Sequence, residues 1–131
     1  MILFAFHLSV LAAAGPYDET ANATQNIKSA LAEAKAKKKL VLIQFGTNRC
    51  ADCLALDKGL KAGKLSRFVD SHFVVVHVDV GDSDRNMDIV QSIGNPIAKG
   101  MPAVVVTRAA ARLLSLPMPG SLPRRERTAK G

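Results

Sequence analysis

Three short apolar runs, separated by segments with helical periodicity, constrain the fold of this chain more than any other feature. The runs at 40–45, 73–79 and 103–107 have the length and composition of strands, and the first is continuous enough to be buried on both faces. Apolar residues recur at helical spacing from 24 to 39, from 50 to about 70 and from 85 to 93. Strands that alternate with helices predict one α/β domain with helices packed on a parallel or mixed sheet.

The helical segments carry boundary signals of their own. We expect Thr24 to cap the first helix and the lysines at 37–39 to end it, because cations favour a helix C-terminus. The second helix is expected to kink at Gly59 or Gly63. Its expected apolar face consists of Cys53, Leu56, Leu60, Leu65, Phe68 and Val69.

The N-terminal segment 1–14 has the composition of an export signal. It is mostly apolar and ends in the small residues at 12–14. It lacks the lysine or arginine that usually stands directly after the first methionine of an export signal. An uncleaved anchor and a misplaced start codon are the competing interpretations. Export predicts a periplasmic or secreted protein, with a polar linker at 15–23, a folded domain at 24–107 and a basic tail at 108–131.

The positive charge of the chain is concentrated in that tail. Of the formal net charge of +7, the tail contributes +5 from six basic residues and one acid, and the remainder is nearly neutral at +2. A basic groove for nucleic acid is therefore not supported, and no nucleic-acid partner is expected.

Cys50 and Cys53 are the only cysteines, and they stand where an apolar strand gives way to a helix. Unpaired backbone amides and the helix dipole stabilise a thiolate at that position. Cys50 would face solvent and attack a substrate disulfide, and Cys53, deeper in the first turn, would resolve the mixed disulfide. The pair is thus the candidate catalytic site.

Three other interpretations of the pair are open. The first is a zinc site, but zinc needs four ligands and the chain has no second cysteine pair. The second is a structural disulfide, but a bridge that closes so short a loop would constrain the unfolded chain little. The cysteines could also serve only in packing. Neither metal nor organic cofactor is expected, since the disulfide itself is the redox group.

The motifs together resemble the thioredoxin superfamily, and in particular the C-terminal domain of bacterial transmembrane disulfide reductases. The resemblance rests on the segments 39–46, 50–57, 73–80 and 100–106, taken in that order. It implies a three-layer α/β/α sandwich. It also implies that Pro102 is a cis-proline beside the dithiol, and that Met101 presents backbone groups to an extended substrate.

Three residues near the cysteines are expected to tune them. Arg49 stands where the family usually has tryptophan, and its charge favours a thiolate. Gln44 matches the buried acid that accepts a proton in thioredoxins, and an amide cannot do so. Asp52 opposes thiolate formation but suits a helix N-terminus, so the redox direction stays open.

The resemblance implies a thiol–disulfide oxidoreductase that acts on exported proteins and draws electrons from a membrane-bound or small thiol. The alternative is a catalytically weak binding protein that keeps the fold. The sequence leaves the oligomeric state open.

The family pattern stops near Thr107. The expected partner strand and C-terminal helix are not apparent, and prolines at 117, 119 and 123 prevent a long helix. We hypothesise a shift of reading frame there, with a natural basic extension as the alternative. An incomplete sheet would expose an edge and an apolar face and lower the stability of the domain.

Overall fold

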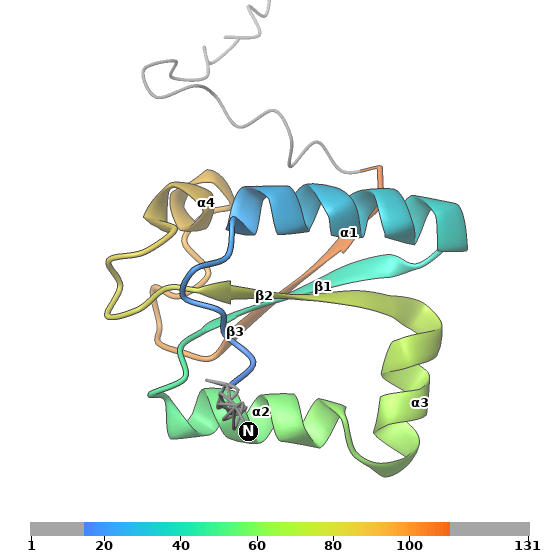
Figure 1. The fold of residues 1–131 in the computed structure, drawn as a ribbon, viewed down its shortest axis with the longest axis horizontal. Helices are drawn as coiled ribbons and strands as arrows, with labels where there is room; N and C mark the ends of the chain where they lie inside the picture. Colours follow the sequence, from blue (N-terminus) through green and yellow to red (C-terminus); the bar gives the residue numbers. More distant parts are fainter. Residues whose placement is uncertain (1–14, 111–131) are drawn as a thin grey trace, which may run out of the picture.

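The computed structural model describes residues 15–110, which form four helices and three strands around one sheet (Figure 1). In chain order these are α1 (Ala23–Lys37), β1 (Leu40–Gly46), α2 (Ala51–Leu60), α3 (Gly63–His72), β2 (Phe73–Asp79), α4 (Met87–Ser92) and β3 (Ala103–Arg108). The export signal expected at 1–14 and the tail from 111 to 131 lie outside the described residues, as do the frame shift and the missing elements expected near the C-terminus.

The sheet is mixed, which is one of the two arrangements that the alternation of elements predicts. Its strand order is β2-β1-β3, with β1 parallel to β2 and antiparallel to β3. The register places Gln44 beside His77 on one side and beside Val104 on the other. Because β1 is central, every residue after Leu40 in it is buried, which confirms the prediction from its continuous apolar run.

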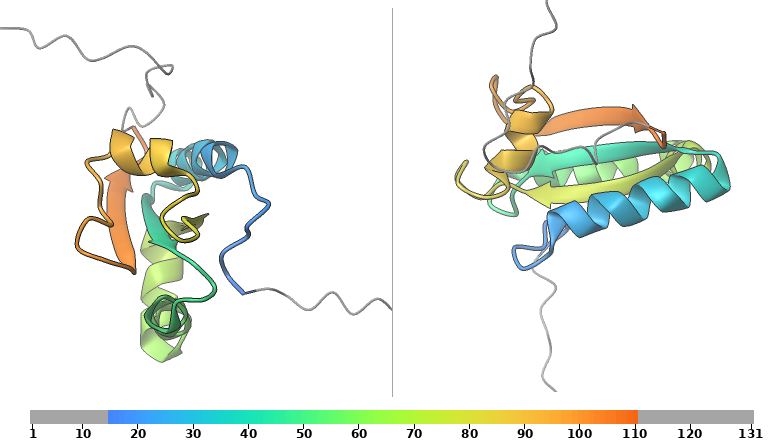
Figure 2. Two further views of the ribbon diagram at one scale, coloured as in Figure 1. Left: turned by 90° about the vertical axis from the view of Figure 1, so that its left-hand side faces the viewer. Right: turned by 90° about the horizontal axis from the view of Figure 1, so that it is seen from above.

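Helices cover both faces, so the fold is the expected three-layer α/β/α sandwich. Figure 1 shows α1 on one side of the sheet and α2 on the other, and the left view of Figure 2 shows α4 close to α1. Val41, Ile43 and Phe45 belong to the main core with α1 and α4. Side chains alternate along a strand, so Leu42 and Gln44 face the α2 layer instead.

The first helix begins earlier than expected. Its N-cap is Asn22, whose Oδ1 accepts a hydrogen bond from the Gln25 amide at 3.0 Å, and Thr24 lies inside the helix. An asparagine in that place satisfies a free amide of the first turn as well as threonine would have done. The helix ends, as expected, within the lysine run, where Lys38 adopts the left-handed conformation.

The second helical segment is divided into two helices and not merely kinked. α2 ends at Leu60, and α3 begins at Gly63, whose φ of +54° is a conformation that glycine adopts freely. The new axis changes which residues face inward. Val69 is buried, but Leu65 and Phe68 are about half exposed, so the expected apolar face is wrong at these two positions.

The fourth helix is shorter than the expected span of 85–93. Arg85 is not helical, and its guanidinium instead contacts Asp79 Oδ2 at 3.1 Å and Glu19 Oε2 at 3.2 Å. Asn86 donates to the Asp79 carbonyl at 2.7 Å. These contacts hold the loop after β2 and delay the start of α4 to Met87.

Within residues 15–110, β3 pairs with β1 alone. Val104 and Val106 lie on the same face as Leu42 and Gln44, and they are 43% and 51% exposed. This part of the sheet is therefore uncovered by any described residue. No helix in the same range is long and apolar enough to cross a bilayer.

Candidate active site

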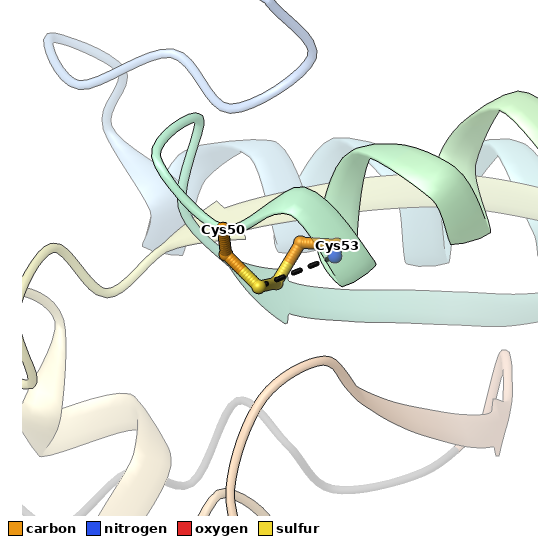
Figure 3. Close-up of a disulfide and its surroundings, with 2 residues drawn as sticks. All are labelled: Cys50 and Cys53. Atoms are coloured by element: carbon orange, nitrogen blue, oxygen red, sulfur yellow. Dashed lines mark hydrogen bonds between the residues drawn. A yellow bond between two sulfur atoms is a disulfide. The ribbon is translucent and has the colours of Figure 1, made fainter.

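Cys50 and Cys53 are joined by a disulfide at the start of α2 (Figure 3). Cys50 is the N-cap residue, and its Sγ accepts a hydrogen bond from the Cys53 amide at 3.2 Å. Their Cα atoms are 5.2 Å apart, within the usual range for a disulfide. Cys50 is partly exposed and Cys53 is fully buried, so Cys50 is the only one of the two cysteines that solvent reaches.

The loop before the helix sets this geometry. β1 ends at Gly46, and the Cys50 amide then donates to the Thr47 carbonyl at 3.1 Å, which closes a turn. The first turn of α2 leaves backbone amides directed toward the cysteines, where they favour a negative sulfur. The sequence expectation that the pair opens a helix is met in this arrangement.

Tyr17 packs directly behind the cysteine pair. It is fully buried, although the sequence predicts a polar linker over 15–23, and residue 23 belongs to α1. A Cβ atom at Gly46 would lie 2.7 Å from Tyr17 Oη and 2.8 Å from Cys53 Sγ. Glycine is required here because backbone, phenol and sulfur approach one another too closely for any side chain.

Asn48 ties the Tyr17 segment to the active-site loop. Its Oδ1 accepts from the Tyr17 amide at 3.0 Å, and its Nδ2 donates to the Tyr17 carbonyl at 2.6 Å. The side-chain amide thus pairs with both backbone groups of one residue, 31 positions away in the chain. The segment predicted as a linker is therefore a structural part of the site.

A chain of polar side chains runs from β1 through β2 to α2, the helix that begins at the cysteine pair. Gln44 Nε2 lies 3.2 Å from His77 Nε2, which lies 2.7 Å from Asp57 Oδ1. Lys61 donates to Asp57 Oδ2 at 2.7 Å. All but Lys61 are largely buried, and the four side chains line a cavity of about 140 Å³ between the sheet and the α2–α3 layer.

Two groups in this region have shifted pKa values. Burial raises the pKa of Asp57, but the hydrogen bonds from Lys61 and His77 outweigh it, so the net pKa lies below the ordinary value. Burial and then the charge of Asp57 raise the pKa of Tyr17 to about 12. Around neutral pH the site thus holds an ionised carboxylate and a protonated phenol.

The tuning residues proposed from sequence occupy different surroundings. Gln44 is fully buried, and its Oε1 has no partner among the described residues. Arg49 is exposed, and its guanidinium contacts Asp82 Oδ1 at 2.9 Å. The positive charge of Arg49 is therefore paired with a carboxylate. Asp52 is exposed in the first turn of α2. Their effects on the thiols stay predictions.

Met101 and Pro102 lead into β3. The peptide bond between them is cis, and both residues are partly exposed. Ala103 pairs with Phe45 in the antiparallel ladder, and Pro102 precedes Ala103 in the chain. Pro102 therefore lies near the end of β1, where the loop that carries Cys50 begins. Their role in positioning substrate stays a prediction.

Three residues of the site were not predicted from the sequence as functional: Tyr17, Asp57 and His77. Asp57 stands four residues after Cys53, so the two share one helix face, and this spacing was an available signal. His77 is the polar interruption of a strand rich in valine. No local pattern marks Tyr17, because its burial depends on contacts made by distant residues.

Comparisons with known proteins agree with this architecture. A family model described as thioredoxin-like matches residues 22–109. A crystal structure of a disulphide isomerase from Xylella fastidiosa Temecula1 superposes with a TM-score of 0.70 and 47% sequence identity, covering 72% of each chain. No curated protein matches the sequence. No group of three His, Cys, Asp or Glu side chains in residues 15–110 is arranged to hold a metal ion.

Proposed function

The chain belongs to the thioredoxin-like family, and on that premise we propose that it is a thiol–disulfide oxidoreductase that exchanges disulfides with exported proteins. One observation carries the proposal. Cys50 is partly exposed at a helix N-terminus, and Cys53 is buried one turn deeper with its sulfur bonded to that of Cys50. The related crystal structure is described as a disulphide isomerase, which supports protein disulfides as the substrate class.

The exchange proceeds in two displacements. The Cys50 thiolate attacks one sulfur of a substrate disulfide, forming a mixed disulfide and expelling the other substrate sulfur as a thiolate, which takes up a proton. The Cys53 sulfur then attacks Cys50 Sγ. This forms the Cys50–Cys53 disulfide and releases the second substrate sulfur, so two electrons pass from the cysteine pair to the substrate.

The second displacement requires Cys53 to lose its proton in a buried place. Gln44 cannot accept it, because an amide has no basic site near neutral pH. The ionised Asp57 and its partner His77 are the titratable groups of the same buried layer, and we assign proton removal to this pair. Asp57 occupies the helix position one turn after Cys53 and so faces the same side.

Met101 and Pro102 would receive the substrate backbone next to the attacking sulfur. Their partial exposure at the entry to β3 leaves room for an extended chain. No metal or organic cofactor takes part in the scheme. A membrane-bound or small thiol would return the disulfide to the dithiol, and the export signal expected at 1–14 would place the protein in the periplasm or outside the cell.

A turnover assay tests the function. The full chain should accelerate reduction of a disulfide-bonded protein such as insulin by dithiothreitol, and refolding of a scrambled disulfide protein measures isomerisation. Cys50→Ser should abolish both activities. Cys53→Ser should instead accumulate a mixed disulfide through Cys50, because attack still occurs and resolution does not.

The same assay separates the enzyme from the alternative of a catalytically weak binding protein. Wild-type activity equal to that of Cys50→Ser would exclude the enzyme. Measuring the reduction potential of the pair then assigns the redox direction, because it places the protein between reductants and oxidants.

A further inference from the structure

The Tyr17 hydroxyl is a buried hydrogen-bond donor close to the cysteine pair. Tyr17 is fully buried, and Oη has no hydrogen-bond partner among the described residues. Native proteins seldom leave a buried hydroxyl unpaired, because its lost hydration is not replaced. Tyr17 Oη is therefore available to an acceptor that forms beside it.

The Cys53 sulfur is the reacting atom beside this hydroxyl. The position that a Cβ would take at Gly46 is 2.7 Å from Tyr17 Oη and 2.8 Å from Cys53 Sγ. The two atoms are therefore separated by no more than the sum of those distances. Because Gly46 has no Cβ, no side-chain atom of residue 46 separates the hydroxyl from the sulfur.

The phenol is held firmly in this place. Asn48 binds both backbone groups of Tyr17, and the ring packs edge-on against His77 with centroids 5.3 Å apart. Neither contact involves the hydroxyl. The surroundings thus orient the ring and leave its donor free.

The chemistry of the sulfur changes on reduction. A sulfur in a disulfide is a weak acceptor, whereas a thiolate is charged and accepts strong hydrogen bonds. The raised pKa of Tyr17, about 12, keeps the phenol protonated, so it acts as a donor throughout the neutral range. Asp57 and His77 are the other titratable groups that face this region, and a carboxylate cannot donate to the sulfur.

We propose that Tyr17 Oη donates a hydrogen bond to Cys53 Sγ when the pair is reduced and thereby stabilises the resolving thiolate. The inference rests on the proposed function, and it makes Tyr17 a catalytic residue for the second displacement. Reduction by two glutathione thiols, which become one glutathione disulfide, supplies the two electrons and two protons that open the bond. The hydroxyl gains its partner in that step.

Tyr17→Phe removes the hydroxyl and leaves the ring. In the full chain carrying Cys50→Ser, so that Cys53 is a free thiol, we expect Tyr17→Phe to raise the Cys53 pKa and to lower the thiolate fraction at neutral pH about tenfold. In the chain with both cysteines, the equilibrium constant for reduction by glutathione should fall, which moves the potential toward a more negative value, because the reduced form loses a stabilising hydrogen bond. Unchanged values in both measurements overturn the inference.

Thr47→Val is the matched control, because Thr47 carries the other buried hydroxyl without a partner in the described part of the chain. It should leave the Cys53 pKa near the wild-type value, and an equal shift in both variants overturns the specific role of Tyr17. The wild type offers a measurement that needs no folded variant at position 17. Tyr17 is the only tyrosine and no tryptophan is present, so its ultraviolet absorption must shift as Cys53 ionises, and a constant spectrum contradicts the bond.

These experiments separate the inference from the function. The pKa of Cys53 in the Cys50→Ser background requires no turnover, so a shift there supports the bond even if catalysis is absent. A wild-type chain that turns over disulfides normally, with no effect of Tyr17→Phe, retains the function and loses the inference.

Discussion

Replacing Gly46 by alanine should destabilise the protein, whereas the same change at Gly59 should stabilise it. The Cβ of alanine at position 46 would lie 2.7 Å from Cζ and Oη of Tyr17 and 2.8 Å from Cys53 Sγ, closer than such atoms approach in proteins. None of these atoms is the free end of a flexible side chain. Tyr17 is buried and clamped by Asn48, and Cys53 is bonded to Cys50.

The magnitudes follow from these surroundings. Forcing one extra methyl group into a well-packed interior costs about 1–3 kcal/mol. At Gly59, near the end of α2, nothing lies within 4 Å of the added Cβ, and φ is in the ordinary range. Alanine there should add about 0.5–1 kcal/mol through its helix propensity. The two variants should therefore differ by about 1.5–4 kcal/mol although the chemical change is identical.

Urea unfolding of the oxidised full chain measures both effects, provided the slope with denaturant is unchanged. We expect a lower midpoint for Gly46→Ala and a slightly higher midpoint for Gly59→Ala. Slower exchange with glutathione should accompany Gly46→Ala alone, because its Cβ displaces the sulfur. A Gly46→Ala protein as stable as the wild type would refute the close packing of phenol and sulfur.

Three further outcomes follow from other contacts of the site. The pKa of Asp57 is lower in the folded state than its unfolded value of about 3.9. The ionised carboxylate therefore stabilises the fold above that unfolded value, and this stabilisation is lost as pH falls through the folded pKa. Asp57→Asn should remove this effect, so the free energy of unfolding should depend less steeply on pH in the acid range. Asn48→Ala should lower stability by about 1–2 kcal/mol and speed proteolysis at 15–22, because two hydrogen bonds to Tyr17 are lost; an unchanged cleavage rate would contradict the clamp. Arg49→Gln should change the free energy of unfolding by less than about 1 kcal/mol, because the pair of Arg49 with Asp82 is exposed, and a larger loss in urea titrations would show that the pair is more than a surface contact.

Local sequence was sufficient to predict the strands and the place of the cysteine pair. Apolar runs of strand length and apolar residues at helical spacing report burial directly, so the three strands and the mixed α/β architecture were predictable from the sequence. The position of Cys50 and Cys53 between a buried strand and a helix was readable in the same way. The apolar periodicity and the place of the cysteine pair both depend on residues that are close together in the chain, so they can be recognised from the sequence.

The environment of the cysteines was decided only by the tertiary structure. The parallel register places His77 beside Gln44, helix packing brings Asp57 to His77, and the Asn48 contacts hold Tyr17, which belongs to a segment that looks like a linker. These partners are 20 to 33 residues apart, and no periodicity connects them. Sequence therefore determined where the cysteine pair stands in the fold, and long-range packing decided which groups surround it, because burial of a polar side chain depends on every element that closes over it.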